Sequence, residues 1–289
     1  MQLGLLPAMG GSIAELQKSG QDSRPVDGYM RAYAGSFGRI WYFSYAPWSL
    51  DRYIGDAQLL ASVRILGPRR PASRALRALA IPLVHDRTTR DCAVLRVFQI
   101  AGVVPALIAR ARHRVPSVTT YGFWYDTLSQ PGPKRRLKTF VQRLGLRHAA
   151  VVIATTEPLA AQAARFAPRV VVIPNGVDTR RFVPMTGTGR QHAEGERRIL
   201  SVGRLSREKN LSTLIRAAAM LKTRVLVKLV IVGSGPLRER LAAEAAAAAV
   251  PVEFRGVVDQ RRLPALYRDA AASCWRRSPK AIPRSCSKR

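Results

Sequence analysis

The chain has 289 residues, enough for two α/β domains with separate cores, and its apolar content of 47% argues against a disordered protein. Its 48 Lys and Arg against 18 Asp and Glu give a net charge of +30, which favours anionic partners, although an Arg-rich composition also follows from a GC-rich gene. The three cysteines show no metal-ligand spacing and the sequence shows no secretion signal or long apolar run, so we expect a cytoplasmic protein that is neither secreted nor membrane-spanning.

The first part of the sequence alternates strand patterns with helical patterns. The expected elements are strand 1–7, helix 26–37, strands 39–45 and 62–66, helix 72–83, strand 94–99, helix 103–112, strand 117–121, helix 134–147, strand 150–155, helix 158–166 and strand 169–173. Strands that are apolar throughout, such as 151–154, are typical of a parallel sheet covered on both faces. Gly10 and Gly11 follow the first strand, where they let a ligand approach the backbone or simply form a flexible loop. We therefore predict a Rossmann-like domain over residues 1–185.

The pattern restarts after a polar, glycine-bearing stretch at 186–196, which we expect to be a linker. The expected elements are strand 197–202, helix 211–221, strand 225–232, helix 237–248, strand 252–255 and helix 263–269. Gly233 and Gly235 follow the second of these strands and Gly256 follows the third, either for close approach of a nucleotide or for a tight turn without a ligand. Residues 197–270 thus indicate part of a second α/β domain of the same kind.

The strongest functional signal lies between residues 169 and 210. The strand at 170–173 ends at Pro174-Asn175-Gly176, because Pro fixes φ and Asn and Gly tolerate positive φ. The strand ending at Val202 runs into Gly203 and Arg204, and Lys209 follows just before a helix. Open α/β sheets bind anionic ligands at the carboxyl ends of their strands. The sequence therefore predicts an anion site formed by Arg204 and Lys209.

These segments also resemble a known family. The runs Ile-Pro-Asn-Gly-Val-Asp at 173–178, Arg-Phe at 181–182 and Val-Gly-Arg-Leu-x-x-x-Lys-Asn at 202–210 resemble the interdomain segment and donor-phosphate loop of GT4-family retaining glycosyltransferases. The resemblance implies a GT-B fold, in which two Rossmann-like parallel-sheet domains face a cleft, with the first domain on the acceptor side and the second incomplete here.

The resemblance also implies roles for individual residues. Arg204 and Lys209 would be the catalytic residues that neutralise the departing diphosphate of a nucleotide sugar. Binding of the donor would involve Gly10, Gly11, Gly203, Gly233, Gly235 and Gly256. The nucleotide sugar is a substrate and no cofactor is implied. The sequence has no Asp-x-Asp motif and no cluster of metal ligands, so we expect a mechanism without a metal.

The helix at 134–148 combines apolar residues at helical spacing with cations. The cations are Lys134, Arg135, Arg136, Lys138, Arg143 and Arg147. Such a basic amphipathic helix can lie on an anionic membrane, which would suit a lipid-linked acceptor, or can be an ordinary surface helix. We therefore consider a peripheral location at the inner face of the membrane.

After Ala270 the sequence departs from the family pattern. The resemblance predicts an apolar strand followed by two glutamates that hold the donor, but residues 271–289 form a basic, aperiodic tail without either glutamate. Codons read one frame over can encode such a segment, so we hypothesise a frameshift in a truncated chain, which the coding DNA would test. This polypeptide would then be weakly active or inactive, because a half-built sheet exposes apolar faces.

The function predicted from these observations is transfer of a sugar, with retention, from a nucleotide-diphosphate sugar to a glycan or lipid-linked acceptor. The alternative is a non-catalytic fragment from a disrupted glycosyltransferase gene. A nucleic-acid-binding protein is disfavoured, because the basic residues lack a recognised binding module or interleaved stacking aromatics.

Overall fold

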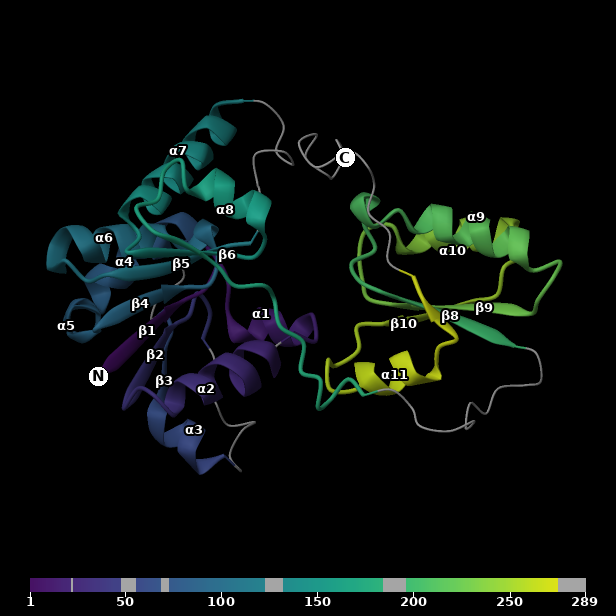
Figure 1. Ribbon diagram of the computed structural model, residues 1–289, viewed down its shortest axis with the longest axis horizontal. Coiled ribbons are helices and arrows are strands. Elements are labelled where there is room, and N and C mark those ends of the chain that lie inside the picture. Colours follow the sequence, from purple (N-terminus) through teal and green to yellow (C-terminus); the bar gives the residue numbers. More distant parts are fainter. Residues whose placement is uncertain (22, 48–55, 69–72, 123–131, 184–195, 275–289) are drawn as a thin grey trace. The chain divides into compact units, whose positions relative to one another are not determined.

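The computed structural model describes residues 1–21, 23–47, 56–68, 73–122, 132–183 and 196–274 (Figure 1). The chain forms two compact units, Met1–Gln17 with Asp22–Gly176, and Lys18–Gln21 with Val177–Arg289. The first unit therefore ends at the Pro-Asn-Gly turn that the sequence marks as a strand terminus. Most of the linker expected at 186–196 lies outside the described residues.

The first unit is built on a sheet of seven parallel strands in the order β3-β2-β1-β4-β5-β6-β7. The strands are β1 (Gln2–Leu6), β2 (Arg39–Phe43), β3 (Val63–Leu66), β4 (Val94–Val97), β5 (Ser117–Tyr121), β6 (Val151–Ala154) and β7 (Val170–Val172). From β1 the chain first builds outward through β2 to β3 and then, from β4, in the other direction. In open α/β sheets such a reversal marks where ligands bind, beyond the carboxyl ends of the strands.

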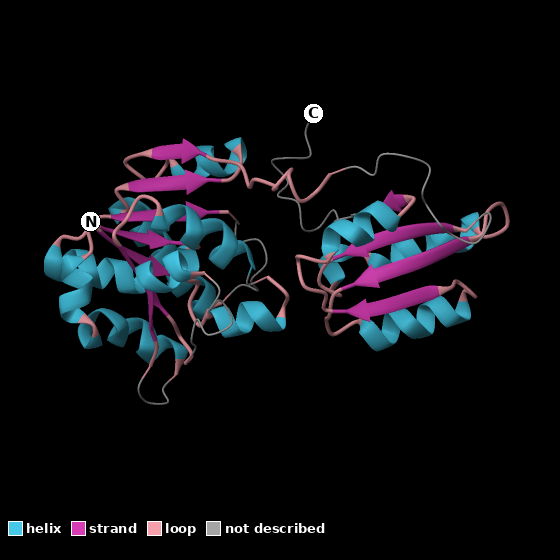
Figure 2. Cartoon of the chain, turned by 90° about the horizontal axis from the view of Figure 1, so that it is seen from below, coloured by secondary structure: helices cyan, strands magenta, loops and turns pink. Residues whose placement is uncertain are grey.

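Helices cover both faces of this sheet (Figure 2). The helices are α1 (Ile13–Lys18), the π-helix η1 (Arg24–Met30), α2 (Arg31–Ala34), α3 (Ala57–Ser62), α4 (Arg74–Val84), α5 (Asp86–Asp91), the 3₁₀ turn η3 (Ile100–Gly102), α6 (Val104–His113), α7 (Pro133–His148) and α8 (Glu157–Ala163). Successive strand residues face opposite ways, so Leu5 packs with Met30 of η1 and Leu6 packs with Ala78 of α4. The two apolar faces of β1 thereby join two separate core clusters.

The second unit contains a four-stranded parallel sheet in the order β10-β9-β8-β11. Its elements are β8 (Arg197–Val202), the 3₁₀ turn η5 (Arg207–Lys209), α9 (Leu211–Leu221), β9 (Val227–Val232), α10 (Arg238–Ala247), β10 (Val252–Gly256), α11 (Leu263–Asp269) and β11 (Ala272–Ser273). α9 and α10 pack on one face through Leu214, Ile215 and Leu241. On the other face, Leu200 and Val230 pack with residues of α11.

The expected α/β class with parallel sheets is confirmed. The helix expected at 26–37 is instead a π-helical segment followed by α2, and the short helices α1, α3 and α5 were not expected. β11 was not expected either: Ala272 and Ser273, in the segment interpreted as an aberrant tail, pair with Ile199 and Leu200 of β8. Residues 275–289 of that tail lie outside the described residues.

Candidate functional site

Three loops of the second unit meet where β8, β9 and β10 end. Parallel strands bring their carboxyl ends to one edge, and backbone hydrogen bonds continue the pairing into the loops. Gly203 N donates to Val232 O (2.9 Å) and Gly233 N donates to Gly256 O (2.6 Å). Leu205 N donates to the backbone carbonyl oxygen of Ser234, again at 2.9 Å. The structure therefore brings together the six predicted site residues that belong to this unit.

Gly233 and Gly235 are required by the packing of one loop on another. A Cβ at Gly233 would lie 2.0 Å from Gly203 O, and a Cβ at Gly235 would lie 2.4 Å from Leu205 O. Gly233 also has φ 133°, a conformation that side chains rarely adopt. These two glycines thus hold the loop after β8 in place, and a tight turn is enough to explain them.

Gly256 has a different reason to be glycine. Its φ of 63° lies in the left-handed region, yet a Cβ there would have no atom within 4 Å. The position is therefore restricted by backbone conformation and leaves open space above the end of β10.

The two predicted catalytic cations lie on the loop after β8. The Lys209 side chain folds back over the loop, so that a Cβ at Gly203 would lie 3.4 Å from Lys209 Cε and 3.9 Å from its Nζ. Gly203, Arg204, Lys209 and Leu211 line a small hollow with the end of β8. Lys209 is half-buried, whereas Arg204 is exposed and makes no hydrogen bond or ion pair with another described residue.

The local fold explains how Lys209 reaches this position. The turn η5 is followed by Asn210, which adopts φ 48° and lies directly before α9. Asn tolerates this left-handed conformation better than most residues. The chain can therefore turn back sharply, and Leu211 at once enters the core.

Gly10 and Gly11 form a separate loop in the first unit, at the carboxyl end of β1. Gly10 has φ 81°, Gly11 N donates to Ala8 O (2.7 Å) and Gly11 O accepts from Tyr45 N (3.2 Å). The loop is therefore packed and hydrogen-bonded to the segment after β2.

Two contacts of this loop were missed by sequence reasoning. A Cβ at Gly102 would lie only 2.0 Å from Pro7 O, and a Cβ at Gly10 would lie 2.6 Å from Arg74 Cδ. Gly102 is far from Pro7 in the sequence, and Arg74 is one of many arginines. No local pattern could have identified either residue.

An ion-pair cluster joins two strands of the second sheet, β9 and β10. Lys228 (3.0 Å) and Arg255 (2.6 Å) hold the pKa of Glu253 below its usual value and link β9 to β10. Within the part of the chain that the structure describes, no three His, Cys, Asp or Glu side chains are grouped to hold a metal. The loops after β8, β9 and β10 place two cations and several backbone groups at this edge of the sheet.

Family models match the chain in two segments. The model described as Glycosyltransferase Family 4 matches residues 58–181, and the model described as Glycosyl transferases group 1 matches residues 189–284. The chain belongs to the family 4 glycosyltransferases. The second match includes Gly203, Arg204 and Lys209, and it extends into the segment that sequence analysis had treated as aberrant.

A curated relative of this chain is known from two strains of Mycobacterium tuberculosis. It is a GDP-mannose-dependent α-(1-6)-phosphatidylinositol dimannoside mannosyltransferase, 37% identical over 138 residues. That match covers 45% of this chain and 36% of the relative, so the chain matches about a third of the relative's length.

Solved structures show the same fold. HepE of Anabaena, in complex with UDP and glucose, is 17% identical with a TM-score of 0.65, and the match covers 99% of this chain and 77% of HepE. Sucrose-phosphate synthase of Thermosynechococcus elongatus is 19% identical with a TM-score of 0.68, over 94% of this chain and 74% of the synthase. The chain therefore has the two-domain GT-B fold.

Proposed function

We propose that this protein transfers a sugar from a nucleotide-diphosphate donor to a glycan or lipid-linked acceptor, with retention and without a metal. The observation that carries the proposal is the placement of Arg204 and Lys209 beside Gly203, at the carboxyl edge of the second sheet. This is the edge at which α/β sheets bind nucleotides. The second unit then holds the donor and the first unit the acceptor.

The two cations act on the leaving group. As the bond between sugar and phosphate breaks, negative charge gathers on the diphosphate, and fixed positive charges lower the free energy of that transition state. Arg204 presents a planar fork to phosphate oxygens and Lys209 a point charge. Because both are protein side chains, this role needs no metal ion.

Retention follows if the leaving phosphate itself accepts the proton of the incoming hydroxyl on the same face of the sugar. No side-chain nucleophile is then needed. In this mechanism the protein holds the diphosphate still while the acceptor hydroxyl approaches, and the packed loops 203–205 and 233–235 supply the rigidity.

The test is turnover of UDP- and GDP-sugars by the full chain and by Arg204→Gln and Lys209→Met. Loss of one such charge lowers kcat on the order of 10²- to 10³-fold, by analogy with removal of an oxyanion donor. Arg240→Gln is the matched control, because Arg240 is exposed on α10 and has no partner among the described residues. Activity in both site variants within twofold of the unmodified chain would refute these roles.

We further propose that α7 docks on an anionic membrane. Leu137 and Phe140 are 65% and 63% exposed, and the helix sequence contains no Asp or Glu. Its described exposed cations are Arg136, Lys138, Arg143 and Arg147. The side chain of Lys134 lies outside the described residues. Each cation near an anionic surface contributes about 1 kcal/mol.

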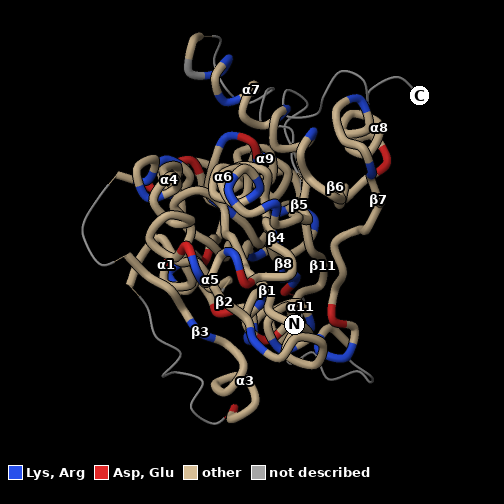
Figure 3. The backbone as a smooth tube through the Cα atoms, turned by 90° about the vertical axis from the view of Figure 1, so that its left-hand side faces the viewer, with Lys and Arg blue, Asp and Glu red and all other residues tan. Residues whose placement is uncertain are grey.

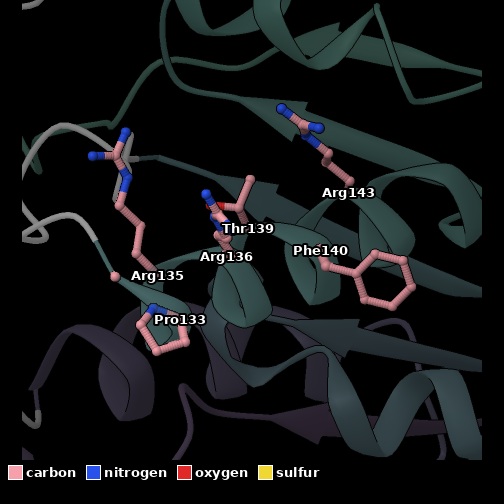
Figure 4. Close-up of a pocket in the computed structure, with 7 residues that line it drawn as sticks. Pro133, Arg135, Arg136, Thr139, Phe140 and Arg143 are labelled. Atoms are coloured by element: carbon pink, nitrogen blue, oxygen red, sulfur yellow. The ribbon is translucent and has the colours of Figure 1, made fainter.

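Cationic and apolar side chains of α7 lie side by side on its exposed surface. Figure 4 shows the guanidinium groups of Arg135 and Arg143 pointing up from the helix while the Phe140 ring points to the side. Arg135, Arg136, Thr139 and Arg143 line a hollow of about 700 Å³ together with Phe140. Figure 3 shows Lys and Arg in blue along the same helix. Such a helix can insert its apolar residues between lipids while its cations meet headgroups.

Sedimentation with vesicles tests the docking proposal. We expect binding to vesicles of phosphatidylglycerol and not to vesicles of phosphatidylcholine, a decrease as salt is raised, and a loss in the double variant Leu137→Ser, Phe140→Ser. Equal binding to both lipids would contradict it. Within the described residues no helix is both long and apolar enough to span a bilayer. We propose a peripheral location on the cytoplasmic face.

A second candidate function is a non-catalytic fragment. It is favoured by the sequence after Ala270, which lacks the two glutamates that the family resemblance predicts, and by the exposure of both residues of β11. Limited proteolysis distinguishes the two: a stable core ending near Gly176, with no turnover of nucleotide sugars, would favour the fragment.

A further inference from the structure

The loop after β1 supports an arginine that no motif marks. A Cβ at Gly10 would lie 2.6 Å from Cδ and 2.9 Å from Nε of Arg74, so the Arg74 side chain rests directly on the α-carbon of Gly10. Any side chain at position 10 would displace it. The glycine-rich loop thus contacts and supports the Arg74 side chain at the carboxyl edge of the first sheet.

A second arginine lies one helical turn further along α4. The Arg77 side chain donates from one terminal nitrogen to the carbonyl of Tyr45, and its Nε is buried without a hydrogen-bond partner among the described residues. Tyr45 N in turn donates to Gly11 O at 3.2 Å. Both arginines are therefore tied to the same loop, Arg74 through Gly10 and Arg77 through Tyr45.

The two arginines occupy the unfavourable end of their helix. The first turn of an α-helix carries partial positive charge, which cations there oppose. The first turn of α4 has no acidic residue, and its cap is the neutral Ser73 hydroxyl, which accepts from Leu76 N (3.3 Å). Arg74 is exposed and makes no hydrogen bond or ion pair with another described residue. Among the residues that the structure describes, no acidic group therefore compensates the positive charge of Arg74.

We propose that Arg74 and Arg77 bind a phosphate group of the acceptor. Arg74 supplies the planar fork that suits phosphate oxygens, and Arg77 adds charge from a fixed position. The inference rests on the proposed function, in which the first unit receives the acceptor. A soluble phosphate ester and a phospholipid headgroup share this chemistry, and the acceptor belongs to one of these two classes.

The test is phosphate binding by the full chain carrying Arg204→Gln, which weakens any competing site in the second unit. Inorganic phosphate is titrated while the midpoint of thermal unfolding is followed. Adding Arg74→Gln should weaken phosphate binding on the order of tenfold or more, as expected for a charged hydrogen bond. Without phosphate the same change should leave the midpoint unchanged or raise it, because it removes repulsion.

Arg87→Gln is the matched control, because Arg87 is an exposed arginine on the neighbouring helix α5 without a partner among the described residues. Equal phosphate affinity of the Arg74→Gln and Arg87→Gln proteins would overturn the inference. So would an equal loss of midpoint by Arg74→Gln with and without phosphate, which would mean a purely structural role.

Two further probes identify the source of the phosphate. Glycerol 3-phosphate represents a soluble ester, and short-chain phosphatidylglycerol below its micelle concentration represents a lipid headgroup. Binding of either that is lost in Arg74→Gln supports the site and names its ligand class, and binding of neither overturns it. These readouts need no turnover, so their failure is distinguishable from failure of the proposed transferase activity.

Discussion

Replacement of Gly233 by alanine should damage the site without touching either cation. Two costs add. The φ of 133° is unfavourable for a residue with a Cβ, at about 1–3 kcal/mol. The Cβ would also lie 2.0 Å from Gly203 O, and overpacking of this kind costs about 1–3 kcal/mol. The total of about 2–6 kcal/mol is a large share of the ~5–15 kcal/mol that stabilises a typical domain.

Alanine substitutions at two other glycines distinguish the conformational cost from the steric cost. Gly256→Ala meets a φ of 63° but no atom within 4 Å, so it should lose only the conformational part, about 1–2 kcal/mol. Gly28→Ala meets neither obstacle and should be neutral or stabilising by up to about 1 kcal/mol.

The measurement is urea unfolding of the three variants, followed by circular dichroism, together with nucleotide-sugar turnover of each. We expect stability to fall in the order Gly28→Ala, Gly256→Ala, Gly233→Ala. If Gly233→Ala lost no more stability than Gly256→Ala, the collision with the loop after β8 would not exist, and the account of how Arg204 is positioned would be wrong.

Three further outcomes are expected. His113, hydrogen-bonded to Asp86 at 2.8 Å, holds the pKa of that carboxyl below its ordinary value. The ionised Asp86 carboxylate therefore stabilises the folded protein above the pKa that it has in the unfolded chain, and this stabilisation is lost as pH falls through its folded-state pKa. Acid unfolding curves of Asp86→Asn should therefore depend less on pH in that range. Gly145→Ala places a Cβ 2.6 Å from Val103 Cγ2 and should destabilise the first unit by about 1–3 kcal/mol, with partial rescue by Val103→Ala in a double-mutant cycle of urea unfolding. Burial raises the pKa of the Cys92 thiol to about 12, so iodoacetamide at pH 8 should label it only after unfolding, as mass spectrometry would show.

The sequence predicted the order of strands and helices well, because apolar runs such as Val151–Ala154 are a local signal. It also placed Gly203, Arg204 and Lys209 on one loop, since the strand and the following helix are both strongly patterned. The short helix α5 has the sequence DRTTRD, which carries no apolar periodicity, and it was missed for that reason.

Packing between segments that are distant in the sequence could not be predicted from any local pattern. Gly102 lies against the carbonyl of Pro7, and Gly233 lies against that of Gly203. In each case only glycine fits, because folding brings a backbone atom of a distant segment to the place where a Cβ would lie. A role for Gly233 in donor binding stays a prediction, and the contact seen in the structure is with another loop. Arg74 was missed because its partner, Gly10, lies on a different element.

The backbone-to-backbone contact of the loops at 203–205 and 233–235 limits how this protein can be altered. Surface loops usually accept insertions and exchange, but here a change in one loop must be matched in its neighbour. Libraries meant to change which donor is used should keep Gly203, Gly233 and Gly235 fixed. Variation at Ser234 and Pro236, which lie between and after those glycines and are exposed, leaves the scaffold intact while changing the surface a nucleotide would meet.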